Sequence, residues 1–281
     1  MLEETKRARP ANRARRHFLG LAAATGAKAT AFGTLALTAS STAAHANKGK
    51  GNAFGWDRGR GNPHGGAHCF LRGTAILTPA GEVRIEHLKV GDLVETVRGQ
   101  PLPVKWIGMH LFRKSRAHWH ERVMPVRVSR HAIDARTPHA DLYLSPDHAL
   151  FLDGVLMPVK ELVNGISIVP ALPADTDVIE YFHILLDTHE AVLAEGVAAE
   201  TCLLGHRGHE DFTNFIEYER LYGGEAPAVK VPIAPLVGYE SGREHLKALL
   251  RLGASPFITV PDPVQSAYER LAARARQLVP G

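Results

Sequence analysis

The sequence predicts a mainly β fold with a partly helical C-terminal extension, on three observations. Between residues 69 and 204, short β-prone runs alternate with turn residues, and few runs there have the length and period of a helix. Residues 205–281 differ, because turn clusters there are followed by two helical patterns. The chain of 281 residues is 45% hydrophobic, which is enough apolar content to bury a core and excludes wholesale disorder.

The predicted strands follow one another closely along the chain. Asp153-Gly154 separates two of them and predicts a tight hairpin turn. Pro125 stands inside another, which should confine that strand to a sheet edge or a bulge, because proline donates no ladder hydrogen bond. The strands are expected at Thr74–Thr78, Glu82–Ile85, Asp92–Val97, Pro103–Met109, Arg122–Ser129, Asp141–Ser145, His148–Leu152, Val155–Met157, Ile166–Val169, Val178–Leu186 and Glu190–Ala194.

The C-terminal extension is assigned to residues 206–281, with helices predicted over residues 242–252 and 263–278. In the second helix the charged side chains lie away from one apolar face, so we expect a solvated helix that docks on the β domain. That face is predicted to hold Val264, Tyr268, Leu271 and Leu278.

The first 46 residues have the pattern of an export signal. A polar, basic stretch precedes a weakly apolar run, and the segment ends at Ala44-His45-Ala46, small residues that suit signal-peptidase cleavage. At the junction, Arg15-Arg16 resembles the twin-arginine export motif. We therefore predict a signal peptide over residues 1–46 and a periplasmic or extracellular protein. The alternative is an uncleaved amphipathic helix, which the scattered Gly and Thr residues disfavour.

The positive charge of the chain belongs mainly to this signal. Residues 1–46 hold seven of the 33 basic and two of the 29 acidic side chains, which leaves 26 basic and 27 acidic side chains after residue 46. The remainder is nearly neutral, so charge gives no argument for a nucleic-acid surface. No apolar run of about 18 residues follows residue 46, so no membrane span is predicted there. Residues 47–68, rich in Gly, Asn and basic residues, predict a flexible leader.

Three motifs follow one another between residues 69 and 205. In residues 69–94, Cys69 precedes a Gly-Thr-x-Ile strand and a Leu-x-x-Gly-Asp-x-Val turn. Residues 144–148 read LSPDH, a Thr/Ser-x-x-His type of block, and residues 179–196 form a closing block. Together they resemble the Hint domain shared by Hedgehog autoprocessing domains and inteins, most nearly its bacterial subgroup in secreted proteins. The resemblance implies a Hint-type horseshoe of short strands over residues 69–205.

Cys69, Ser145 and His148 have the chemistry needed to break the peptide bond between His68 and Cys69. A free thiol with a pKa of about 8.5 is mostly protonated at neutral pH, so Cys69 needs a proton acceptor. The departing amide nitrogen needs a proton donor, and His148 can be that donor because an unperturbed imidazole has a pKa of about 6.5. Ser145 can hydrogen-bond the amide and orient it. The Hint resemblance implies the same roles in an N-to-S acyl shift.

Asp187 and His189 match a more variable part of the Hint pattern, as aids to proton transfer or as structural residues.

The resemblance also implies how such a reaction ends. Glu200-Thr201 stand where an intein has His-Asn, and threonine has no carboxamide to cyclise. We therefore expect single-turnover cleavage or acyl transfer without a cofactor, rather than splicing. The substrate is the chain's own N-terminal leader, and the sequence does not identify the acyl acceptor.

A second hypothesis from the same residues is a protein without catalysis. The resemblance brings the two ends of the Hint region together and so places Cys69 near Cys202, and cysteines of exported proteins are commonly paired. A disulfide at Cys69 would exclude it as a nucleophile, and the chain would be an exported binding or scaffold module. The 16 histidines form no metal signature, and His206 and His209 alone indicate at most a surface pair.

Overall fold

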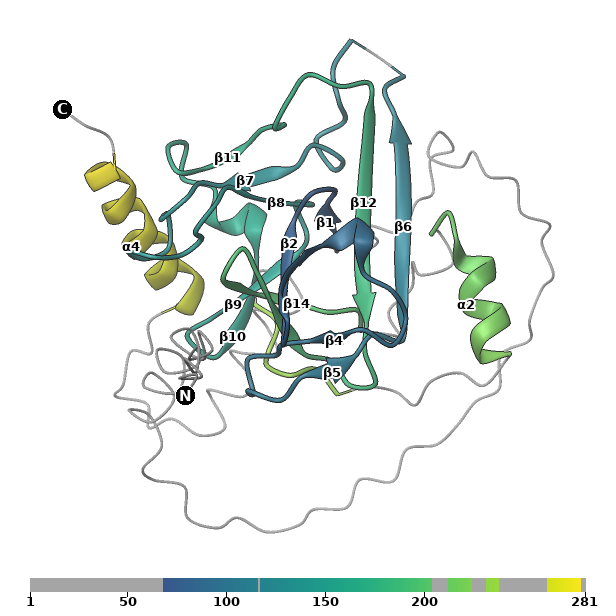
Figure 1. Cartoon of the computed structure of the whole chain (residues 1–281). Helices are drawn as coiled ribbons and strands as arrows, with labels where there is room; N and C mark the ends of the chain where they lie inside the picture. The colour runs from purple at the N-terminus through teal and green to yellow at the C-terminus, as the bar shows by residue number, and fades with distance from the viewer. Residues whose placement is uncertain (1–67, 116, 204–211, 224–230, 238–261, 279–281) are drawn as a thin grey trace, which may run out of the picture. The chain divides into compact units, whose positions relative to one another are not determined.

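The computed structural model describes residues 68–115, 117–203, 212–223, 231–237 and 262–278. The predicted signal peptide, all of the predicted leader except its last residue, and the predicted helix 242–252 lie outside these residues. The described residues form fourteen strands, two short 3-10 helices and two α-helices (Figure 1). The predicted mainly β fold with a C-terminal helix is confirmed.

The first of two six-stranded antiparallel sheets has the strand order β11-β7-β8-β1-β12-β6, with the short β1 in its interior. Its two longest strands, β6 and β12, run side by side (Figure 1). Val178 lies opposite Arg113 at one end of this pair and Leu185 opposite Trp106 at the other. The strands of the sheet are β1 (Phe70–Leu71), β6 (Trp106–Arg113), β7 (Val126–Val128), β8 (Leu142–Leu144), β11 (Ile168–Pro170) and β12 (Val178–Leu185).

The second sheet has the order β10-β9-β14-β13-β2-β3. Its strands are β2 (Ala75–Thr78), β3 (Gly81–Arg84), β9 (Ala149–Leu152), β10 (Val155–Pro158), β13 (Ala191–Ala194) and β14 (Val197–Glu200). The remaining short elements are β4 (Leu93–Val94) paired with β5 (Leu102–Pro103), and the 3-10 helices η1 (Ile85–His87) and η2 (Val159–Leu162).

Two hairpin turns of the second sheet have the same backbone form. Asp153-Gly154 joins β9 to β10 with φ values of 50° and 82°, as its sequence predicts. Glu195-Gly196 joins β13 to β14 with φ values of 46° and 83°. Two successive positive φ values are typical of a type I′ turn, which suits the right-handed twist of the strands. The second turn brings Glu200 back beside β9, where it reaches the candidate site described below.

The strand predicted over residues 122–129 differs from the observed one. It is shorter, Val126–Val128, and β7 lies inside the sheet between β11 and β8 rather than at an edge. Pro125 directly precedes the strand, so its missing N–H is not needed by the ladder. Its carbonyl still accepts a hydrogen bond from the Ala171 N–H at 2.9 Å.

The first sheet separates two apolar clusters. Successive side chains of a strand point to opposite faces, so Phe70 enters the main core while Cys69 and Leu71 enter a second cluster. The main core also takes side chains from the second sheet, such as Ile76 and Leu150. Cys69 therefore lies on the face of the first sheet opposite to the main core.

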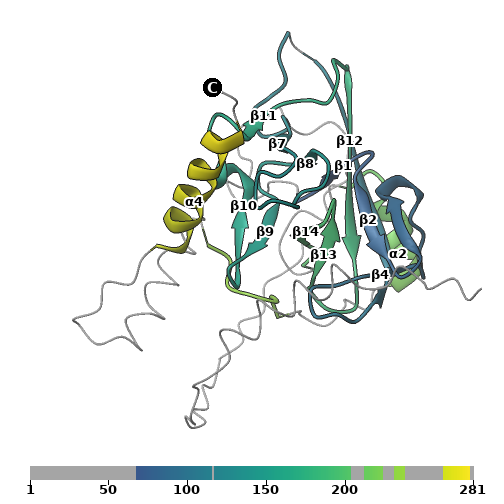
Figure 2. The same ribbon diagram turned by 60° about the vertical axis from the view of Figure 1, so that its left-hand side comes forward.

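The described part of the C-terminal extension packs on the β domain. Helix α4 (Pro263–Leu278) lies beside the β domain (Figure 2). Arg270 lies 2.6 Å from Asp153, and Arg274 donates to the His131 carbonyl at 2.6 Å. The predicted docking helix is thus present, but its buried face differs from the expected one, and Tyr268 is only partly buried while Leu278 is exposed. The buried residues of α4 are Val264, Ala267, Leu271 and Ala275.

A second helix, α2 (Phe215–Tyr222), was not predicted from the sequence and packs beside β6 through Tyr218 and Trp106, whose ring centroids are 5.3 Å apart. None of the helices in the described ranges is both long and apolar enough to cross a bilayer.

Candidate active site

The sheet fixes the backbone of Cys69, which directly precedes β1. β1 pairs with β8 on one side and with β12 on the other. Ser145 directly follows β8, donates its N–H to the Cys69 carbonyl at 2.9 Å and accepts the Cys69 N–H on Oγ at 2.8 Å. That N–H belongs to the peptide bond between residues 68 and 69. The hydrogen bond predicted between Ser145 and this amide is therefore present.

The imidazole of His148 is fully buried and packs on Phe70, the residue after Cys69. The ring centroids of His148 and Phe70 are 4.4 Å apart, and that of His183 lies 5.8 Å from His148. Among the described residues, neither ring nitrogen of His148 makes a hydrogen bond of ordinary geometry. Burial lowers the pKa of His148 to about 4, against the Glu200 carboxylate and the Cys69 backbone, which raise it. The ring is therefore neutral at pH 7 and able to accept a proton.

Glu200, the last residue of β14, carries a buried carboxylate beside His68. Its Oε1 lies 2.7 Å from Nδ1 of His68 and accepts the Ala149 N–H at 2.8 Å. Burial by itself raises the pKa of Glu200, but the charge of His68 and its hydrogen bond to Glu200 hold it well below its usual range. Burial likewise lowers the pKa of His68, and Glu200 more than offsets this, so that the pKa of His68 is raised. The two residues form an ion pair.

The side chain of Cys69 lies in the apolar second cluster, and so does Cys202. Burial, followed by the proximity of Cys202, raises the pKa of the Cys69 thiol well above its usual range. The thiol is therefore protonated at neutral pH. Neither of these two cysteines is in a disulfide in the structure. The other buried members of the cluster are Leu71, Trp106, Ile179, Tyr181, Leu185, Phe212 and Tyr218.

Comparison with known proteins assigns this region to a family. The family model of the Hint domain matches residues 68–206, which include Cys69, Ser145, His148 and Glu200. Residues 68–206 form a Hint domain. No match was found among curated proteins.

Solved structures similar to the chain include two inteins and an intein-like domain. The MchDnaB-1 intein is 13% identical, with 47% of this chain and 99% of the intein covered and a TM-score of 0.33. The gp41-1 intein is 15% identical, with 47% and 98% covered and a TM-score of 0.34. The bacterial intein-like domain from Clostridium thermocellum is 13% identical, with 48% and 99% covered and a TM-score of 0.29. At these scores the domain assignment depends on the family match.

The other two predicted site residues of the Hint domain lie in different surroundings. Asp187 is at the surface, with its side chain 62% exposed and 3.0 Å from Nζ of Lys105. His189 is buried; its Nδ1 accepts the Ile233 N–H at 3.0 Å, and its Nε2 lies 3.8 Å from Glu200, too far for a hydrogen bond. The structure thus brings His189 to the edge of the site and leaves Asp187 in a surface ion pair.

The sequence resemblance predicts that Thr201 stands where an intein has its cyclising asparagine. Its hydroxyl accepts the Glu190 N–H at 2.9 Å and donates to the Glu190 carbonyl at 3.0 Å. The side chain is buried and both of its hydrogen bonds hold the neighbouring backbone. Thr201 therefore has a structural contact in place of a group that could release a peptide.

The histidines of the Hint domain were also considered as metal ligands. Among the residues described, no group of three or more His, Cys, Asp or Glu side chains is placed to hold a metal ion. His206 and His209 lie outside the described residues.

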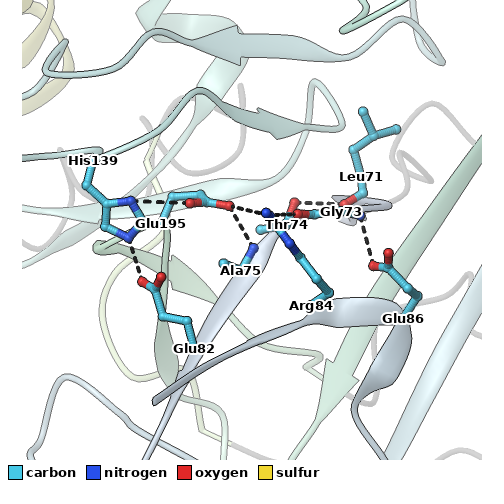
Figure 3. Close-up of polar contacts among 9 residues, drawn as sticks. All are labelled: Leu71, Gly73, Thr74, Ala75, Glu82, Arg84, Glu86, His139 and Glu195. Atoms are coloured by element: carbon cyan, nitrogen blue, oxygen red, sulfur yellow. Dashed lines mark hydrogen bonds and ion pairs between the residues drawn. The ribbon is translucent and has the colours of Figure 1, made fainter.

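A polar network fixes the loop after β1 (Figure 3). The Glu195 carboxylate accepts the Ala75 N–H at 2.7 Å and lies 3.4 Å from Nδ1 of His139. Glu86 accepts the Gly73 N–H at 2.9 Å. The other members of the network are Leu71, Thr74, Glu82 and Arg84. The network holds the chain four to six residues after Cys69 and so supports the position of β1.

Two members of the site were not predicted as functional from the sequence. Glu200 was considered only as a replacement for the histidine of an intein, and His68 only as the residue before the nucleophile. A glutamate that ends the apolar run Val197–Ala199, and that lies near Cys202 in the chain, was the available signal. It indicates a buried charge, which requires a partner.

Proposed function

We propose that the Hint domain breaks the peptide bond between His68 and Cys69 by an N-to-S acyl shift. The observation that carries the proposal is the hydrogen bond from the Cys69 N–H to Ser145 Oγ at 2.8 Å. This hydrogen bond holds the amide between His68 and Cys69 against the turn from Ser145 to His148. The neutral, buried ring of His148 adds support, because its nitrogens make no hydrogen bond of ordinary geometry within the described residues, and a catalytic role accounts for such buried polar atoms.

The reaction requires one proton to move from sulfur to nitrogen. Cys69 Sγ attacks the carbonyl carbon of His68, and His148 takes the thiol proton as the C–S bond forms. The protonated imidazole, with a pKa of about 4, is then a stronger acid than an ordinary imidazolium. It gives the proton to the Cys69 nitrogen, whose N–H is held by Ser145. The C–N bond breaks, and the product is a thioester with a free amine on Cys69.

The thioester is expected to end in cleavage or acyl transfer rather than splicing. Release of an intein needs an asparagine carboxamide, and Thr201 has none. Water, or another nucleophile, then accepts the acyl group that ends at His68, and the Cys69 thiol is regenerated. The leader is the substrate, and no cofactor takes part in these steps.

The test uses the purified, reduced full chain and its intact mass. On incubation with dithiothreitol we expect a loss of mass that corresponds to all residues before Cys69, since a thiol exchanges with a thioester. Cys69→Ala should stay intact under the same conditions. A wild-type chain that keeps its full mass would refute the proposed cleavage.

The second candidate is an exported binding or scaffold module without catalysis. Cys69 and Cys202 lie in one buried cluster, which favours a pairing between them after export. Alkylation of the periplasmic protein without reductant would label neither thiol if the disulfide forms. Labelling of both after denaturation would contradict this alternative.

We also propose that the protein acts outside the cytoplasm, after export through the twin-arginine route. The support is the Arg15-Arg16 motif and the small residues before residue 47. Replacing both arginines by lysine should keep the protein in the cytoplasm, as measured by cell fractionation. Unchanged export of that variant would contradict this route.

A further inference from the structure

We propose that Glu200 is a specificity residue that recognises the side chain of residue 68, so that processing requires a histidine on the acyl side of the broken bond. The inference rests on the proposed function and adds what the domain requires of its own leader.

The contacts of Glu200 place it on the acyl side of the bond. Its Oε1 lies 2.7 Å from Nδ1 of His68, although the two residues are 132 positions apart in the chain. The same oxygen accepts the N–H of Ala149, the residue directly after His148. One buried carboxylate therefore joins the residue before the bond to β9, the strand that begins directly after His148.

The peptide bond is consequently held from both sides. Ser145 accepts the N–H of the bond at 2.8 Å. Residue 68 contributes the carbonyl group of the bond, and Glu200 binds the side chain of this residue. These two contacts restrict the movement of the residues on either side of the planar peptide bond, and such restriction of the reacting groups lowers the entropic cost of attack.

The chemistry of the pair selects for a short cationic donor. The Glu200 side chain is 7% exposed and that of His68 is 28% exposed, so solvent screens their interaction weakly. A carboxylate at residue 68 would be placed against a buried carboxylate and repelled. Alanine would leave Glu200 without its closest cation. The remaining charged or titratable groups that act on the pair are His148, His183, His189, Asp147 and Lys160.

The test compares release rates of variants at residue 68 in two backgrounds. In the wild-type background, His68→Ala should slow thiol-dependent release about 10- to 100-fold and His68→Asp should slow it more. Glu200→Gln keeps the shape and should slow release of the wild-type leader by a similar factor. In the Glu200→Gln background, His68→Ala should add little, because the two residues act through each other. His68→Asp should be less harmful there than in the wild-type background.

A matched control separates recognition from folding. Glu190 is also buried, but its carboxylate pairs with Arg98 at 3.3 Å, so Glu190→Gln should leave the release rate unchanged. The His68 variants change a partly exposed residue that precedes β1 and test the pair without disturbing the core. Equal rates across residue 68 variants, or additive losses in the double variant, would overturn the inference while the proposed function stands. A wild-type chain that releases nothing would overturn both.

Discussion

The two sides of the bond between His68 and Cys69 lie in opposite environments. On the acyl side, His68 forms an ion pair with Glu200, whose carboxylate also accepts the N–H of Ala149, the residue after His148. On the sulfur side, Cys69 lies among apolar side chains with Cys202, and burial raises the pKa of its thiol well above the usual range. The charged side can orient the bond, whereas the apolar side keeps the nucleophile protonated. In the proposed reaction, this difference explains how the Cys69 thiol can stay protonated beside the bond that it is to attack.

The largest effect is expected at the imidazole between the two sides. His148→Gln should lower the rate of thiol-dependent release about 100-fold or more, because the proposed mechanism assigns the proton transfer to this ring. His110→Gln is the matched control: burial lowers the pKa of His110 to about 4 as well, but its ring packs against Phe212, with ring centroids 4.2 Å apart. Equal rates for the two variants would remove His148 from the mechanism.

Acid should destabilise the fold through three buried histidines, His110, His148 and His183. Burial lowers the pKa of His110 and His148 to about 4 and that of His183 well below 6.5. Below about pH 6.5 the unfolded chain binds these protons and the folded chain does not, so the free energy of unfolding rises with pH between about 4 and 6.5. His110 and His148 each contribute on the order of 3 kcal/mol. The pKa of His68 is raised, so this residue by itself would make the free energy of unfolding fall as pH rises.

Urea unfolding followed by tryptophan fluorescence between pH 4 and 7 would measure this dependence. His110→Gln should flatten the curve without touching the candidate site. A free energy of unfolding that stays constant over this range would contradict the neutral, buried state of these rings.

The apolar side can be opened by removing one ring. Phe212 is 8% exposed and packs on Trp106, with ring centroids 5.3 Å apart. Phe212→Ala should lower the free energy of unfolding by about 3 kcal/mol and speed alkylation of the two thiols. Ile216→Ala, at a side chain that is 54% exposed, should change neither. Thiols that react at the wild-type rate in Phe212→Ala would show that this ring does not shield them.

The smallest effect is expected in the network after β1. Glu195→Ala would leave the Ala75 N–H without its acceptor and lower the free energy of unfolding by about 2 kcal/mol. Glu180→Ala, which removes an exposed ion pair with Arg72 at 3.1 Å, should cost less than about 1 kcal/mol. If Glu195→Ala and Glu180→Ala lowered the free energy of unfolding equally in urea or thermal unfolding, the network would contribute no more to stability than an exposed ion pair.

Much of the fold was predictable because its signals are local. The Asp153-Gly154 turn, helix α4 and most strands follow from residue pattern alone. The contact of Ser145 with the amide of Cys69 was also predicted, through motifs in a fixed order. β1 was missed because two residues show no periodicity, and the interior position of β7 was missed because Pro125 stands before the strand rather than within it.

The acyl side of the site was not predictable in the same way. Glu200 and His68 are far apart in the chain, and their contact depends on the pairing of β14 with β9. Asp187 shows the converse, because its place in a motif indicated proton transfer and the structure puts it in an exposed ion pair with Lys105. Motifs identified the residues near the amide of Cys69, whereas a buried charge pair can be found only once the strand order is known.

Trapping with hydroxylamine tests the central claim most directly, because this nucleophile converts a thioester to a hydroxamate. We expect tandem mass spectrometry of the released leader to show a hydroxamate on the carboxyl group of His68, with Cys69 as the new N-terminal residue of the larger fragment. A leader that ends at any other residue, or that is released equally from Cys69→Ala, would contradict the acyl shift.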